Sequence, residues 1–184
     1  MRKFSILSYI FAGLMLSSCD GYLKEDPRDQ LYPEDAYDTP QNVYLNTVAS
    51  LYNYIGGYSD SQGLQGTYRG VYDLNTFTTD EAMLPTRGGD WYDGGFWQGL
   101  FLHKWGTNSD AIQATWEYLY KVIVLSNQSL EILGELRQKT DYNDLDRYEA
   151  EVRAFRAMYY YYLVDMFGHV PLIAVSYTHL TLPT

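Results

Sequence analysis

The sequence predicts an all-α protein in which a pair of long helices carries a long, irregular, aromatic loop. Apolar side chains recur at helical spacing in residues 107–140 and 146–167, as in amphipathic helices. Between residues 79 and 105 this period is lost, although three of the four Trp residues gather there. At 184 residues, of which 46% are hydrophobic, the chain is long enough to form one domain with its own core.

The N-terminus has the layout of a lipoprotein leader. Met1-Arg2-Lys3 is a short basic region, and residues 4–16 are apolar but too few to span a bilayer. They run into Leu16-Ser17-Ser18-Cys19, which contains the only cysteine of the chain. We predict a signal peptide over residues 1–18 and lipidation of Cys19. An ordinary secretory leader with a free thiol is the alternative.

Residues 19–38 are polar, and we interpret them as an acidic tether. The acidic run after Cys19 resembles the signal that sends some lipoproteins to the outer face of the outer membrane. A purely solvated tether is the alternative. The formal net charge of −10 argues against a nucleic-acid partner and against electrostatic adhesion to anionic lipid. We therefore predict a lipid-anchored outer-membrane protein that faces the cell exterior.

A shorter helix precedes the aromatic loop. Thr39 as N-cap and Pro40 at the first helical position predict its start. Apolar residues then recur to Ile55, and Gly56-Gly57 supplies the stop. Residues 71–77 fit either a further helix or a short strand, and the pattern does not decide between them.

The two long helices are predicted to form an antiparallel hairpin. Thr107 with Asp110 predicts the start of the first, and Asp146 with Glu149 that of the second. Gly168 is placed to end the second helix. The residues predicted to share one side of the first helix are Trp116, Leu119, Tyr120, Ile123, Asn127, Leu130 and Leu133, and the apolar side of the second consists of Val152, Phe155, Tyr159, Tyr162, Leu163 and Met166.

Residues 79–105 are predicted to form an ordered binding loop. Long irregular segments within a domain are usually functional or disordered, and disordered segments are poor in aromatic residues. Sugar binding requires flat apolar faces with polar groups beside them. The alternative for Trp97 and Trp105 is that they anchor the core of the loop. The candidate faces are Trp91, Tyr92, Trp97 and Trp105, and the candidate polar partners are Arg87, Asp90, Asp93 and His103.

Other chemistries have weaker support. The acid pairs Asp80-Glu81 and Asp90…Asp93 suit a glycoside hydrolase, but nothing else in the sequence indicates catalysis. Asp90 and Asp93 with loop carbonyls suit Ca²⁺, but the spacing of an EF-hand is absent. The three His residues have no metal-ligand spacing. We predict no catalytic residue, no metal and no cofactor.

Four features resemble the SusD/RagB family of outer-membrane nutrient-binding lipoproteins. The most specific is E-x-R-x-x-R-A-x-Y-Y-x-x-L followed by F-G-x-V-P-L, which matches residues 151–163 and 167–172. The other three are the leader ending at Cys19, Thr79-Asp80-Glu81 before the aromatic loop, and W-x-x-L-Y-x-x-I-x-x-x-N from Trp116 to Asn127. Together they cover about residues 1–173.

The resemblance implies tetratricopeptide-like helix pairs packed against a loop-rich half. It implies a protein for nutrient uptake and polysaccharide utilisation. Such a protein binds an oligosaccharide or other nutrient beside a TonB-dependent, SusC-like transporter and is not an enzyme. The alternatives are a helical-repeat adaptor that binds only proteins, and a glycan hydrolase.

The resemblance covers an N-terminal part of a longer family pattern. Family members are several times longer, so we interpret residues 39–174 as the N-terminal part of a SusD-like helical domain. The last ten residues, VSYTHLTLPT, resemble translated sequencing-adapter sequence. We interpret residues 175–184 as a non-native tail.

Overall fold

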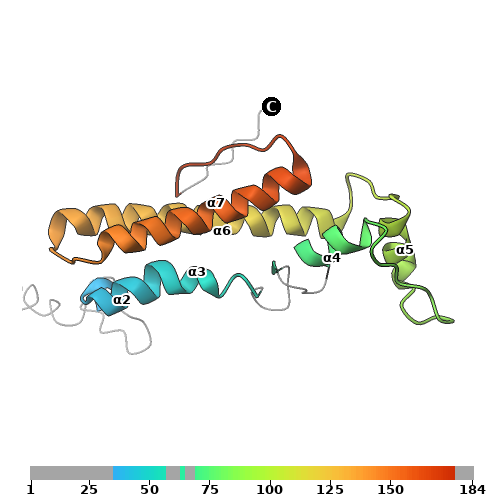
Figure 1. The fold of residues 1–184 in the computed structure, drawn as a ribbon, viewed down its shortest axis with the longest axis horizontal. Coiled ribbons are helices and arrows are strands. Elements are labelled where there is room, and N and C mark those ends of the chain that lie inside the picture. The colour runs from blue at the N-terminus through green and yellow to red at the C-terminus, as the bar shows by residue number, and fades with distance from the viewer. Residues whose placement is uncertain (1–34, 57–62, 65–68, 177–184) are drawn as a thin grey trace, which may run out of the picture. The chain divides into compact units, whose positions relative to one another are not determined.

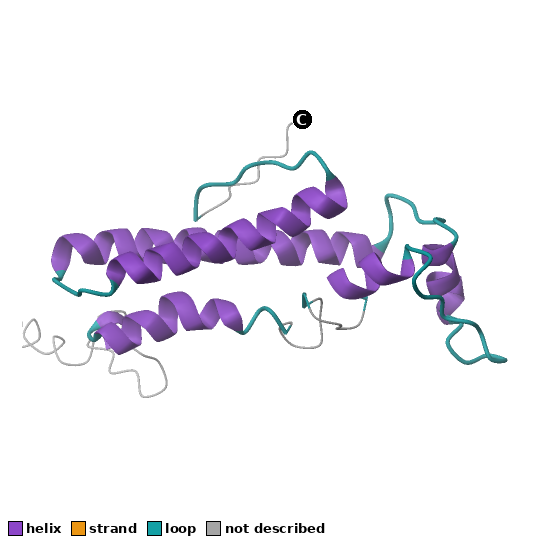
Figure 2. Ribbon diagram, in the orientation of Figure 1, coloured by secondary structure: helices purple, strands orange, loops and turns teal. Residues whose placement is uncertain are grey.

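The computed structural model describes residues 35–56, 63–64 and 69–176, which form helices without a β-sheet (Figures 1 and 2). The predicted all-α class is confirmed. The predicted signal peptide, Cys19, most of the tether and residues 177–184 lie outside the described residues. In chain order the elements are η1 Asp35–Tyr37, α2 Pro40–Tyr44, η2 Leu45–Ala49, α3 Ser50–Tyr52, α4 Val71–Phe77, η3 Asp93–Gly95, α5 Phe96–Phe101, α6 Asp110–Lys139 and α7 Leu145–Phe167.

The described residues contain no helix long and apolar enough to cross a bilayer. The two long helices α6 and α7 are amphipathic, with polar outer residues such as Lys121, Gln128 and Asp165 exposed. Their apolar residues are used in packing against each other and against the first helical segment.

The first helical segment starts where the sequence predicts but contains a π-helical turn. The Thr39 hydroxyl accepts a hydrogen bond from the Asn42 N–H at 3.2 Å, and Pro40 is the first helical residue. The π-helix η2 widens the middle of the segment and changes which side chains face inward. Regular helical spacing predicts a face of Tyr44, Val48, Leu51 and Ile55. The buried residues are instead Val43, Thr47, Val48 and Leu51, so the prediction is correct only for the last two.

Helices α6 and α7 form the predicted antiparallel hairpin (Figure 1). Both predicted starts are wrong, because α6 follows Ser109 and α7 follows Asp144. Thr107 lies in the preceding turn. Asp146 lies inside the first turn of α7, where its Oδ1 is 2.6 Å from Nη2 of Arg137 instead of capping the helix.

The structure confirms the predicted end of α7 and shows which of the two alternatives residues 71–77 adopt. Gly168 has a φ of +73° and its N–H donates to the Val164 carbonyl at 2.9 Å, so it ends α7 as predicted. Residues 71–77, for which both a helix and a strand were considered, form the helix α4.

Tyr159 lies at the centre of the main core and has no exposed surface. Its hydroxyl is 2.9 Å from that of Tyr118, which in turn donates to the Tyr54 carbonyl. Burial raises the pKa of Tyr118 to about 12 and raises the pKa of Tyr159 further, so both hydroxyls stay protonated. Tyr161, two residues along the same helix, is 65% exposed.

Glu149 joins the end of α6 to the beginning of α7. Its Oε1 lies 2.8 Å from Nη2 of Arg137 on α6, and its Oε2 lies 2.8 Å from Nη1 of Arg153. The second contact is the helix-stabilising pair that the i,i+4 spacing predicts. Burial raises the pKa of Glu149, but the two arginines outweigh it, so that the pKa is lowered overall.

This ion pair predicts a pH-dependent stability. A carboxylate whose pKa is lowered by folding stabilises the protein above its ordinary pKa of 4.5, and the contribution is lost as pH falls through the folded-state value. We expect Glu149→Gln to lower the free energy of unfolding by about 1 kcal/mol at pH 7, and by much less at pH 3. Urea unfolding at the two pH values measures this difference.

Glu135→Gln is the matched control. Glu135 pairs with Lys139 at 3.3 Å, but both side chains are more than half exposed, so this change should have little effect at either pH. An equal loss of stability for Glu149→Gln at both pH values would mean that the carboxylate charge is not what stabilises the hairpin.

Candidate functional site

The aromatic segment 79–105 contains a helix, which the sequence analysis did not predict. Gly94 and Gly95 have φ values of +64° and +82°, and the second is the N-cap residue of α5. Such left-handed conformations are accessible to glycine at little cost. The glycine pair therefore turns the chain into a helix instead of keeping the whole segment irregular.

Trp97 anchors the core of this segment. It is 3% exposed, and the rings of Phe77 and Phe96 contact it edge-on at centroid distances of 5.2 and 4.9 Å. Its Nε1–H donates to Oδ2 of Asp93 at 2.8 Å. Nη2 of Arg69 lies 3.0 Å from the same oxygen. Trp97 and Asp93 thus hold the loop together, and the faces of the Trp97 ring are covered.

Arg69 is a residue that the sequence analysis missed. Its guanidinium lies 4.4 Å from the centroid of the Phe96 ring, close enough for a cation–π contact. Its backbone N–H donates to Oδ2 of Asp73 at 2.7 Å, which ties it to the first turn of α4. No spacing signal marks Arg69, because it precedes α4 and meets the loop only through the fold.

The tip of the loop carries four of the predicted site residues. Arg87 and Asp90 pair through their backbones, with N–H···O distances of 3.3 and 3.1 Å, around the turn at Gly88-Gly89. Trp91 and Tyr92 follow and are 52% and 56% exposed. Their rings are accessible, but neither of the two hollows described below is lined by them.

Trp105 is the one residue among the four predicted aromatic faces that borders a surface hollow. It is 45% exposed, and the His103 ring contacts it edge-on at a centroid distance of 5.3 Å. Nε2–H of His103 donates to the Thr78 carbonyl at 2.6 Å, which ties this pair to the end of α4. The indole is therefore held from one side while part of its surface stays accessible.

Two hollows meet at Trp105. The first, which we call the Trp105 cleft, has a volume of about 300 Å³. The second, the loop hollow, has a volume of about 410 Å³. The Trp105 cleft is lined by Leu74, Asn75, Thr78, Leu100, Trp105, Ile112, Asp165, Met166 and Phe167. The loop hollow is lined by Asp93, Gly94, Gly95, Phe96, Gly99, Leu100, Lys104, Trp105, Gly106, Asn108 and Ser109.

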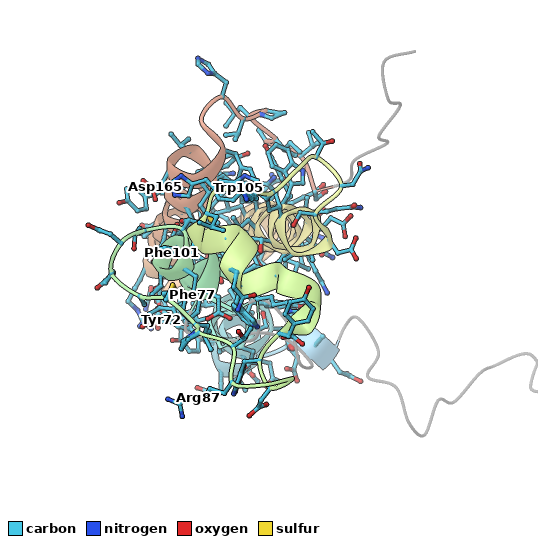
Figure 3. The ribbon with its side chains drawn as sticks, turned by 90° about the vertical axis from the view of Figure 1, so that its right-hand side faces the viewer. Tyr72, Phe77, Arg87, Phe101, Trp105 and Asp165 are labelled. Carbon is cyan, nitrogen blue, oxygen red and sulfur yellow. The ribbon has the colours of Figure 1, made fainter. Side chains whose placement is uncertain are left out.

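The predicted site residues therefore divide into separate groups. Trp105 and Asp93 border the hollows, whereas Arg87 lies at the loop tip, well apart from Trp105 and Asp165 (Figure 3). Asp165 was missed by the sequence analysis. It lies on α7, sixty residues from Trp105 along the chain, and only the packing of α7 brings it to the cleft.

Backbone strain is concentrated in this loop. Of the four non-glycine residues with positive φ in the described part of the chain, Trp91, Asp93 and His103 belong to it, at +57°, +43° and +55°. Such conformations persist where surrounding contacts fix them, and they cluster at ligand sites. The contacts of Asp93 with Trp97 and Arg69, and of His103 with Thr78, fix two of these strained residues.

The described residues contain no group of three or more His, Cys, Asp or Glu side chains arranged to hold a metal ion. Of the acids considered for Ca²⁺, Asp93 accepts from both Trp97 and Arg69 on one carboxylate oxygen. The polar groups of the two hollows suit hydrogen bonding to a neutral, hydroxyl-rich ligand. The aromatic surface between them suits stacking against a flat apolar face.

The comparisons with known proteins give the family. The chain belongs to the SusD-like family, described as starch-binding and associating with the outer membrane, whose model matches residues 34–182. The predicted family resemblance is confirmed. SusD-like proteins are binding proteins rather than enzymes.

A named relative supports the same family. The chain is 26% identical over 175 residues to SusD-like protein P25 of Formosa agariphila, an alignment that covers 93% of this chain and 31% of that protein. The chain thus spans about a third of the length of this relative. No solved structure matches the chain.

Proposed function

We propose that this chain belongs to a surface lipoprotein that captures a glycan and passes it to a TonB-dependent, SusC-like outer-membrane transporter. The family description supports a starch-type ligand and an outer-membrane location. The leader ending at Cys19 supports lipid anchoring, and residues 19–38 would then serve as the tether. Residues 39–174 would form the N-terminal part of the binding domain, and residues 175–184 would be non-native.

The observation that carries this proposal is the position of Trp105. An accessible indole lies between two hollows. The volume of the loop hollow, about 410 Å³, is within the range of ligand pockets, and that of the Trp105 cleft, about 300 Å³, is at the lower limit of this range. A pyranose ring that stacks on the indole would have polar groups on either side. Asn75 and Asp165 line one hollow, and Asn108 lines the other.

Trp91 and Tyr92 supply a second aromatic surface at the loop tip. They are exposed and accessible, so a longer oligosaccharide would meet them as an auxiliary platform outside the hollows. Capture in this account combines stacking with hydrogen bonds that neutral side chains and carboxylates make to sugar hydroxyls. The mechanism ends with release to the transporter and contains no bond-breaking step.

The test is a titration of the protein with maltoheptaose, an α-linked glucan oligosaccharide, by calorimetry. Cellohexaose, which differs in its linkage, is the control ligand. We expect saturable binding of maltoheptaose, weaker binding of cellohexaose, and no shortened product by chromatography after prolonged incubation. Product formation would favour the hydrolase alternative. Absence of sugar binding, with co-purification of a transporter, would favour the adaptor.

A further inference from the structure

Two residues of the family motifs lie outside the hollows and have a different role. Asn127 ends the motif on α6, and Arg156 belongs to the motif on α7. Asn127 is buried, and its Oδ1 accepts a hydrogen bond from Nη1 of Arg156 at 2.7 Å. An arginine only donates, so this contact fixes the orientation of the amide and directs its NH₂ group away from Arg156.

The amide NH₂ group of Asn127 binds the chain that follows α7. Nδ2 donates to the carbonyls of Ile173 and Val175, each at 3.0 Å. We call residues 170–174 the strap, and Figure 1 shows that the chain after α7 runs back along the hairpin. An amide NH₂ group has two N–H bonds, each of which can donate. One amide can therefore hold both.

Two tyrosines extend this arrangement along the strap. The Tyr160 hydroxyl donates to the Ile173 carbonyl at 2.9 Å and accepts from the Ile173 N–H at 2.7 Å. The Tyr120 hydroxyl donates to the Pro171 carbonyl at 2.8 Å. Every one of these contacts is made to the backbone of the strap. The side chain of Leu172 between them is 82% exposed, whereas those of Val170 and Ile173 pack against the main core.

The strap is connected to the Trp105 cleft through aromatic contacts. Tyr120, which holds Pro171, lies against Trp116 at a centroid distance of 4.8 Å. Trp116 meets Phe167 edge-on at 5.0 Å. Phe167 lines the Trp105 cleft together with Asp165, on the last turn of α7. The strap and this wall of the cleft are thus held by one packed group of side chains.

We propose that Asn127, oriented by Arg156, is a main-chain clamp that holds the strap on the α6–α7 hairpin and thereby positions the last turn of α7 at the Trp105 cleft. Asn127 is a positioning residue in this account, because it does not line the cleft. The effect on ligand binding rests on the proposed function, whereas the clamp itself does not.

Hydrogen exchange with Asn127→Asp tests the clamp. The carboxylate still accepts from Arg156, but it cannot donate to the carbonyls of Ile173 and Val175. We expect amide exchange in residues 168–174 to accelerate by about tenfold or more, with little change in α6 and α7. Gln128→Glu is the matched control, because it makes the same amide-to-acid change at the adjacent exposed position and should leave exchange unaltered. A uniform acceleration across both helices, or none, would overturn the proposal.

A second variant tests the clamp independently, in case Asn127→Asp does not fold. Tyr160→Phe removes the hydroxyl that contacts Ile173 and keeps the ring, so we expect a smaller acceleration confined to the same residues. The affinity for maltoheptaose then tests positioning, and we expect about a tenfold loss with Asn127→Asp and none with Gln128→Glu. A loosened strap with unchanged affinity would refute the positioning role. If the unmodified protein binds no sugar, the proposed function fails, and exchange alone decides the clamp.

Discussion

Replacement of Trp105 by Ala is expected to weaken maltoheptaose binding by roughly 30-fold, or about 2 kcal/mol, the size of effect typical of a central aromatic contact. The indole is the one aromatic ring that borders both hollows, so its removal takes away the stacking surface on which both depend. Its side chain is 45% exposed, and we therefore expect the fold to persist. Calorimetry gives the affinity, and circular dichroism checks the helices.

Two variants show whether this loss is specific. Trp105→Phe keeps a flat apolar face and should retain measurable binding. Trp91→Ala removes a ring of similar exposure at the loop tip, outside both hollows, and should have a smaller effect. If Trp91→Ala instead abolished binding while Trp105→Ala did not, the ligand site would lie at the loop tip.

The largest effect on stability is expected for Tyr159→Ala, which should lower the free energy of unfolding by about 3–5 kcal/mol. Tyr159 is fully buried, stacks on Phe155 at a centroid distance of 5.5 Å and meets Tyr118 edge-on at 5.9 Å. Deleting the ring creates a cavity between the two long helices and removes the hydroxyl contact to Tyr118. Urea unfolding of the chain and its variant gives the difference.

The controls separate ring packing from the hydroxyl. Tyr159→Phe keeps the ring and should cost only about 1 kcal/mol, because Tyr118 can still donate to the Tyr54 carbonyl. Tyr161→Ala makes the same truncation at a position that is 65% exposed, and should change stability by less than about 0.5 kcal/mol. A similar loss for Tyr159→Ala and Tyr161→Ala would contradict the described core.

The helical scaffold was largely predictable because its long helices have a clear period. Leu119, Ile123 and Leu133 on α6 are buried as the spacing indicates. The wrong predictions of helix starts occur where a local sequence pattern is overridden by a tertiary contact. Asp146 resembles a helix cap in sequence, but Arg137 from the neighbouring helix pairs with it. The π-helix η2 left no mark in the pattern of apolar residues.

The candidate site was less predictable, because its residues come from distant parts of the chain. The sequence placed every candidate within residues 79–105. The structure brings Asp165 from α7 and Asn75 from α4 to the same cleft as Trp105. It also assigns Arg69 a role in holding the loop. Neither an isolated Asp on an exposed helical face nor an Arg in a glycine-rich stretch carries a signal that spacing reveals.

One measurement tests the central claim most directly, an NMR titration of the protein with maltoheptaose that follows the indole N–H signals of its four Trp residues. The account predicts a saturable shift of the Trp105 signal, a smaller shift for Trp91, and little change for the buried Trp97 and the core-packed Trp116. Saturation without movement of the Trp105 signal would contradict the account, because the ligand would then bind away from the one indole that borders both hollows.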